Sequence, residues 1–180
     1  MATRKATPWE ERAITAYHEA GHLTATLFCE YFGLRDPAVQ LDLKGSFAAL
    51  SGAKKIKSTA DPVAAKESVR EFVMIAFSGK AAEETLEALT AARGQRVIPN
   101  PGGAQHDLLT IQNTLGEQAM EHEYDALWTR SQELIAENWA IVEQIAELII
   151  LAPSSEISRA SILALPAVRD RARPRGENGV

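Results

Sequence analysis

The sequence predicts an α+β domain that is mostly α-helical and carries one small antiparallel hairpin. Three observations lead to this class. A capping residue followed by proline marks the starts of two helical segments, apolar residues recur at helical spacing through most of the 180 residues, and polar–apolar alternation is confined to one stretch. The length fits a single domain. We place this domain at residues 1–168 and expect the charged segment 169–180 to be a disordered tail.

The first predicted helix begins in the stretch TPWE. Thr7 is suited to the N-cap, Pro8 to the first helical position, where its missing N–H costs nothing, and Glu10 completes a capping box. Glycine is the preferred residue just after a helix, so we predict that this helix runs from Pro8 to Phe32 and stops at Gly33.

The hairpin is predicted between residues 39 and 50. Val39, Leu41 and Leu43 alternate with polar residues, a Lys-Gly-Ser turn follows at 44–46, and a second apolar segment occupies 47–50. This pattern is typical of two short antiparallel strands joined by a turn.

A second helix is predicted to start at Pro62, with Asp61 as its cap. Apolar residues follow at helical spacing as far as Phe77. Ser78 and Gly79 then predict a bend or break, after which the helical pattern resumes over residues 80–92.

Three further helices are predicted in the second half of the chain. The first is entered from a glycine turn at residues 102–103, after a surface loop at 93–103. The longest periodic segment, 123–152, predicts one continuous helix that Pro153 ends. A last short helix is expected to be capped by Ser158.

Composition narrows the classes of function. The net charge of −5 argues against nucleic acid as the main partner, because phosphate binding needs a basic face. Cys29 is the only cysteine, which excludes an internal disulfide and a cysteine-based zinc cage. No apolar run reaches the roughly 18 residues that span a bilayer, and the N-terminus lacks the apolar core of a signal peptide. We therefore expect a soluble, cytoplasmic protein.

The stretch AITAYHEAGHLTA carries the strongest functional signal, the pattern His-Glu-x-x-His. On a helix His18 and His22 lie on one face, so both imidazoles can bind one Zn²⁺ ion. Glu19 can then take a proton from a water molecule at the metal's open position. Gly21 within a helix suggests a packing or site requirement, because glycine costs about 1 kcal/mol relative to alanine. The alternative is two histidines that share a helix face by chance.

A catalytic zinc site usually has three protein ligands, and with only two further histidines in the chain a carboxylate is the expected third. Here the chain resembles the peptidase domain of the FtsH-type ATP-dependent zinc metalloproteases, from about Pro8 to Leu165. Three stretches in the same order carry the resemblance: AYHEAGH (16–22) is similar to that family's zinc helix, SGKAAEE (78–84) to its Gly-Gly-Arg-Ala-Ala-Glu-Glu segment, and GGAQHDL (102–108) to its glycine turn and following helix start. The late helices also resemble those of the family.

The resemblance implies a ligand set of His18, His22 and Asp107, with Zn²⁺ as cofactor. The alternative role for Asp107 is a charge at a helix N-terminus that interacts with the helix dipole. His106 is a rival ligand next to it. Glu83 and Glu84 could also approach the site, and we expect one of them to orient a ligand histidine and the other to be solvated.

The resemblance implies a zinc-dependent endopeptidase that cleaves unfolded or flexible polypeptides, with Glu19 as the catalytic base. The chain contains no Gly-x-x-x-x-Gly-Lys-Ser/Thr phosphate loop, so we expect its activity to be independent of ATP. The family also implies a homo-oligomer, a hexamer, and a substrate paired to an edge strand, here within residues 39–52. The alternative for that stretch is a purely structural hairpin. An ATPase acting in trans is the other partner considered, and no residue of the sequence points to it. The alternatives are a catalytically silent metal-binding or scaffold relative, and a helical domain without metal. His122 is expected to be exposed.

Overall fold

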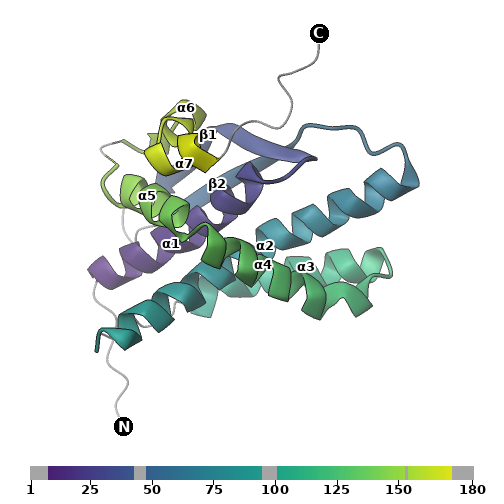
Figure 1. The fold of residues 1–180 in the computed structure, drawn as a ribbon, viewed down its shortest axis with the longest axis horizontal. Helices are drawn as coiled ribbons and strands as arrows, with labels where there is room; N and C mark the ends of the chain where they lie inside the picture. Colours follow the sequence, from purple (N-terminus) through teal and green to yellow (C-terminus); the bar gives the residue numbers. More distant parts are fainter. Residues whose placement is uncertain (1–7, 43–47, 95–100, 153, 172–180) are drawn as a thin grey trace.

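The computed structural model describes residues 8–42, 48–94, 101–152 and 154–171, which form a mostly helical molecule with a small three-stranded antiparallel sheet (Figure 1). The predicted α+β, mostly helical class is confirmed. The elements in chain order are α1 (Pro8–Leu27), β1 (Phe32–Asp42), β2 (Ala48–Lys55), α2 (Pro62–Ala92), α3 (Pro101–Glu117), the 3₁₀ turn η1 (Glu121–Glu123), α4 (Tyr124–Glu137), α5 (Trp139–Ile150), β3 (Glu156–Ile157), α6 (Arg159–Leu163) and α7 (Pro166–Arg171).

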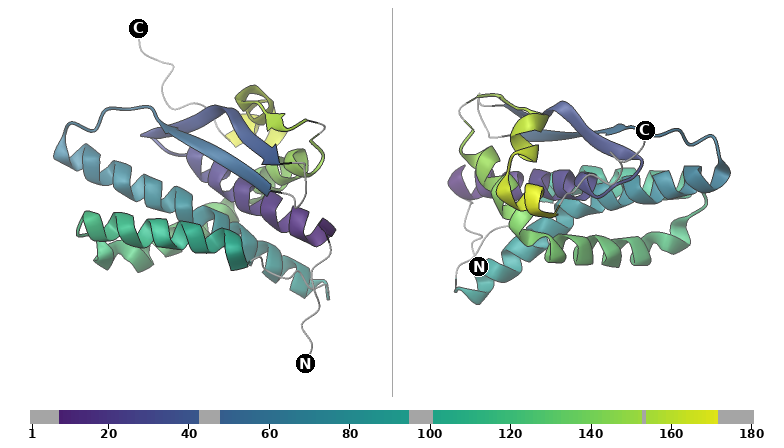
Figure 2. Two further views of the ribbon diagram at one scale, coloured as in Figure 1. Left: turned by 180° about the vertical axis from the view of Figure 1, so that it is seen from behind. Right: turned by 45° about the horizontal axis from the view of Figure 1, so that its top comes forward.

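The sheet has the strand order β2-β1-β3 and lies along one side of α1 (Figure 2). The strands are longer than predicted, because β1 already begins at Phe32 and β2 continues to Lys55, while β3 was missed. Between Leu34 and Val39 the register shifts, at a cis Asp36–Pro37 peptide, and this bulge conceals the alternation in the first half of β1. The predicted turn at 44–46 lies outside the described residues.

Helix α1 ends at Leu27, five residues before the predicted end, and the prediction that it reaches Phe32 is wrong. The physical reason is a side chain from α2. The Glu71 carboxylate accepts the backbone N–H groups of Glu30 and Tyr31 at 2.7 and 2.8 Å, which draws these donors away from a continuing helix. The predicted Thr7 cap lies outside the described residues.

Helix α2 runs without interruption for 31 residues, so the predicted break at Ser78 and Gly79 is absent. Its start is as predicted, because the Asp61 side chain accepts the Ala64 N–H at 2.8 Å. Ser78 and Gly79 are both buried in the middle of α2. The Ser78 hydroxyl donates to the Met74 carbonyl one turn earlier, at 2.7 Å, so its polar group is satisfied within the helix.

The segment 123–152 forms two helices rather than one. The change of direction is at Asn138, whose φ and ψ of −115° and 24° leave the helical region and whose side chain donates to the Leu134 carbonyl at 2.8 Å. The predicted Ser158 cap is confirmed by its hydrogen bond from the Ser161 N–H at 3.1 Å. Helix α7 extends to Arg171, into the predicted tail, and residues 172–180 lie outside the described part.

Two apolar clusters fix the positions of the first three helices. One joins α1 to the sheet, to the C-terminal half of α2 and to α5, and the other joins the first half of α2 to α3 and α4. Burial of each Leu, Ile or Phe side chain contributes about 1.5–3 kcal/mol, so these clusters hold the helices in place. The largest fully buried side chains include Leu23, Phe77, Ile111, Leu115, Ile141, Ile145 and Ile149.

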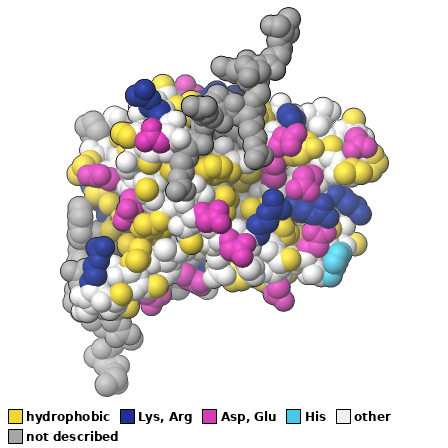
Figure 3. Space-filling view, viewed as in Figure 1, with side chains coloured by type: hydrophobic (Ala, Val, Ile, Leu, Met, Phe, Trp, Pro, Cys, Tyr) yellow, Lys and Arg dark blue, Asp and Glu magenta, His cyan; other side chains and the backbone are white. Residues whose placement is uncertain are grey.

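On the outside, acidic and basic side chains are interspersed with apolar ones over the face shown in Figure 3. One charged contact on the surface ties α2 to η1: Arg70 donates through Nε and Nη2 to the Glu123 carboxylate at 2.7 and 2.8 Å. Among the helices of the described residues, none has both the length and the apolar character needed to cross a membrane.

Candidate metal centre

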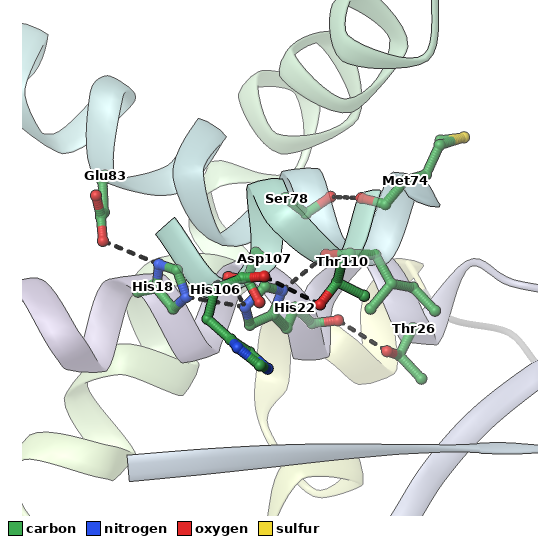
Figure 4. Close-up of polar contacts among 10 residues, drawn as sticks. His18, His22, Thr26, Met74, Ser78, Glu83, His106, Asp107 and Thr110 are labelled. Atoms are coloured by element: carbon green, nitrogen blue, oxygen red, sulfur yellow. Dashed lines mark hydrogen bonds and ion pairs between the residues drawn. The ribbon is translucent and has the colours of Figure 1, made fainter. Parts of the chain in front are cut away.

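Helix α1 presents His18 and His22 on one face, one turn apart. Their ring centroids are 4.6 Å apart with the planes nearly perpendicular, and their Nε2 atoms lie 3.0 Å from each other (Figure 4). The His18 side chain is 8 % exposed and the His22 side chain 12 %. The helical spacing seen in the sequence therefore places both rings in one nearly buried location.

Asp107 reaches the same location from α3. Its Oδ2 atom lies 3.0 Å from His18 Nε2 and 3.3 Å from His22 Nε2. Helix α3 already begins at Pro101, so Asp107 lies in the second turn, beyond the first turn in which the helix dipole acts strongly. The alternative role of Asp107 as a charge at the helix N-terminus is therefore not the one that the structure favours.

The three donor atoms have the spacing that a small cation needs. Within the described part of the chain, His18, His22 and Asp107 are the group of potential ligands whose donor atoms lie within 4.8 Å of one another. The three donor atoms are 3.0, 3.0 and 3.3 Å apart, so the circle that passes through them has a radius of about 1.8 Å. The bond from Zn²⁺ to an imidazole nitrogen is slightly longer, about 2.0–2.1 Å. One ion just outside the plane of the three atoms can therefore bind all of them.

A second observation about Asp107 agrees with this fit. Its Oδ2 atom is buried and, among the described residues, has no hydrogen bond of acceptable geometry, although two ring nitrogens lie close to it. An unsatisfied buried carboxylate oxygen is costly unless a cation or proton compensates it. The residues present therefore fit a divalent metal ion bound by two imidazoles and one carboxylate.

Helix α2 supplies a partner for the other nitrogen of each ring. His18 Nδ1 lies 2.9 Å from Glu83 Oε1 (Figure 4). His22 Nδ1 lies 2.7 Å from the Ile75 carbonyl oxygen. In the neutral rings both acceptors favour the tautomer with hydrogen on Nδ1, which leaves the Nε2 lone pair free to bind a cation on the side of Asp107. The expected contact from one glutamate is thus made by Glu83. The Ile75 carbonyl was missed, because a main-chain acceptor leaves no signal in the sequence.

The other candidate residues lie outside this group. Glu84 pairs with Lys80 at 3.4 Å on the outer side of α2, and its side chain is 41 % exposed. His106 is exposed, as is His122, whose position agrees with the expectation from the sequence. The sequence left open which of Glu83, Glu84 and His106 approaches the histidine pair, and the geometry selects Glu83.

Glu19 follows His18 on α1 and is 7 % exposed. It is not a member of the ligand group, yet it is near enough to His18 to favour the protonated form of that ring. A carboxylate that is near the candidate ligands without belonging to the ligand group is a candidate general base.

The electrostatics of the cluster favour a shared positive charge when no metal is bound. Burial by itself would lower the pKa of His18, but the Asp107 and Glu83 carboxylates against its two ring nitrogens outweigh burial and raise the pKa to about 10. Burial likewise would raise the pKa of Asp107, but His18 and His22 hold it well below its usual range. A metal ion must therefore displace a proton in order to bind.

We predict that the affinity for Zn²⁺ rises with pH. Zinc binds neutral imidazole, whereas the pKa of about 10 keeps His18 protonated at neutral pH in metal-free protein. One proton then leaves as one ion binds, so the affinity should increase about tenfold per pH unit between about pH 6 and pH 8. Competition with a chromophoric chelator, corrected for the chelator's own protonation, measures this slope. An affinity that does not change over this range would contradict the predicted displacement.

Two imidazoles and one carboxylate are a donor set found in catalytic zinc sites, which keep a further position for water or substrate. Helices α1 and α3 supply these donors, and α2 supplies the groups that orient the rings.

No protein-family model matches the chain, and a search of curated proteins finds no match to it.

Proposed function

We propose that the chain is a zinc-dependent endopeptidase that cleaves unfolded or flexible polypeptides without using ATP. The observation that carries this proposal is the convergence of His18 Nε2, His22 Nε2 and Asp107 Oδ2 within 3.3 Å of one another. The resemblance of three sequence stretches to the FtsH-type peptidase domain supports the same activity, since these stretches contain the three ligands and Glu83.

In the proposed reaction each residue of the metal centre has a separate role. A zinc ion held by His18, His22 and Asp107 would supply the Lewis acid that polarises the peptide carbonyl and lowers the pKa of water. Glu19 would accept the proton of the attacking water and return it to the amine that leaves. Glu83 would keep the His18 ring oriented with Nε2 available as a ligand.

The proposed position of the substrate is along an edge strand. In the described sheet β2 pairs with β1 alone and packs beside α1, the helix that carries the two histidines (Figure 2). An extended polypeptide could pair with the other edge of β2 through main-chain hydrogen bonds, as in other cases of strand addition. Such pairing requires a segment without its own secondary structure, which is why the proposed substrates are unfolded or flexible.

The test is hydrolysis of unfolded casein by purified protein with one equivalent of Zn²⁺. We expect cleavage of casein, no cleavage of a stably folded protein of similar size, and loss of activity after removal of zinc by a chelator. Activity should return when zinc is restored. If the zinc-loaded protein leaves several unfolded substrates intact, the proposed activity fails.

One observation favours a second candidate, a metal-binding domain without hydrolytic activity. Glu19 is only 7 % exposed, so access of substrate and water to this carboxylate is restricted in the conformation seen here. The two candidates predict the same zinc stoichiometry and differ in hydrolysis. The casein experiment therefore separates them.

A further inference from the structure

One face of α2 lies against the histidine pair over about two helical turns. Ile75, Gly79 and Glu83 are spaced four residues apart and so lie on the same side of the helix. The Ile75 carbonyl accepts a hydrogen bond from His22, and the Glu83 carboxylate contacts His18. Gly79 lies midway between these two contacts.

Gly79 leaves room that the two imidazoles fill. A Cβ atom built on it would lie 2.6 Å from both Cε1 and Nε2 of His22 and 2.8 Å from Cε1 of His18, closer than real Cβ contacts. His22 Nε2 is one of the three donor atoms of the metal centre. Because the far nitrogen of each ring is held by Ile75 or Glu83, neither ring can withdraw without loss of that contact.

We propose that Gly79 is a positioning residue of the metal centre. Because it has no side chain, α2 lies directly against both imidazoles and holds their Nε2 atoms toward Asp107. This inference rests on the metal centre of the proposed function and is independent of whether the centre hydrolyses peptides. It also gives a reason for glycine in the middle of a helix that does not bend or break there.

The neighbouring Gly21 has a different role. A Cβ atom on Gly21 would lie 2.2 Å from the Ser78 carbonyl oxygen and 2.9 Å from Ala82 Cβ, so it would force α1 and α2 apart. A methyl group on Gly79 would instead meet the ends of side chains, which can rotate away at the expense of the metal centre. Gly79→Ala is therefore expected to act on metal binding more than on the fold.

The first test compares Gly79→Ala with Gly116→Ala. Gly116 is a matched control, because it also lies in a helix and its added Cβ would find its nearest neighbour, Glu121 Oε1, at an ordinary 3.8 Å. We expect Gly79→Ala to weaken Zn²⁺ binding by at least about tenfold and to alter the visible absorption of bound Co²⁺, as loss of an orienting contact does. Gly116→Ala should match the wild type in both measurements.

Two results would overturn the proposal. Wild-type Zn²⁺ affinity and an unchanged Co²⁺ spectrum in Gly79→Ala would show that Gly79 does not position the metal centre. The proposed function would not be affected by that result. Absence of specific Zn²⁺ and Co²⁺ binding in the wild type itself would overturn the metal centre, and with it both proposals.

A double-mutant cycle in the presence of a chelator tests the contact without any metal. Urea unfolding is measured for the wild type, Gly79→Ala, His22→Ala and the double variant. We expect Gly79→Ala to shift the midpoint less in the His22→Ala background, because the ring that the methyl group would approach most closely, at 2.6 Å, is gone and only the contact with His18 at 2.8 Å remains. An equal shift in both backgrounds would overturn the proposal. If Gly79→Ala fails to fold, folding of the double variant supports the proposal and its failure to fold overturns it.

Discussion

Replacement of Glu19 by glutamine is expected to reduce peptide hydrolysis by about 10²–10⁴-fold without loss of zinc. Glutamine matches glutamate in size, so the nearly buried site at 7 % exposure should keep its packing, but the amide cannot accept the proton of water. The decrease corresponds to about 2.7–5.5 kcal/mol of transition-state stabilisation. Values of kcat/KM on a fluorogenic peptide, with zinc content measured on the same samples, give the result.

The matched control for this experiment is Glu84→Gln. The substitution is chemically identical, but Glu84 lies on the outer side of α2, paired with Lys80 at 3.4 Å, and should leave hydrolysis and zinc content unchanged. Full activity of zinc-loaded Glu19→Gln would show that Glu19 is not the base. Equal inactivity of wild type and variant, both with zinc bound, would favour the metal-binding domain without hydrolytic activity.

Replacement of Asp107 by alanine is expected to weaken Zn²⁺ binding by at least about 100-fold. Loss of a group that merely orients a ligand costs about 10–100-fold in affinity, and loss of a direct ligand should cost more. The reason lies in the geometry, because Asp107 Oδ2 is within 3.3 Å of both ring nitrogens and completes the set of three donors. Competition with a chelator of known affinity measures the change, and hydrolysis at limiting zinc should disappear with it.

Asp125→Ala is the matched control for the Asp107 experiment. Asp125 is an exposed aspartate in the first turn of α4 and lies outside the ligand group of the described residues. Its replacement should leave Zn²⁺ affinity unchanged. Wild-type affinity in Asp107→Ala, with the fold intact by circular dichroism, would mean that another group provides the third ligand.

Several features of the structure could be predicted because their causes are local in the chain. The four-residue spacing of His18 and His22 places both rings on one helix face, and the capping bonds of Asp61 and Ser158 are made to residues three positions away. The mostly helical class follows from the same periodicity. Such features need no knowledge of how distant segments pack.

Two features that depend on distant segments were predicted incorrectly or missed. Helix α1 ends early because Glu71 of α2 accepts the N–H groups of Glu30 and Tyr31. Strand β3 has only two residues, and it forms because β1 is beside it. In both cases a partner far along the chain outweighs the local preference.

The sequence by itself determined that two imidazoles share a helix face with Glu19 beside them, because this follows from the pitch of an α-helix. The tertiary structure decided that Asp107 meets those imidazoles and that Glu83, rather than Glu84, orients one of them. It also placed Gly79 against both rings. The physical reason is that two apolar clusters fix α1, α2 and α3 relative to one another. The distances between side chains on different helices depend on this packing, and the periodicity of the sequence gives no information about it.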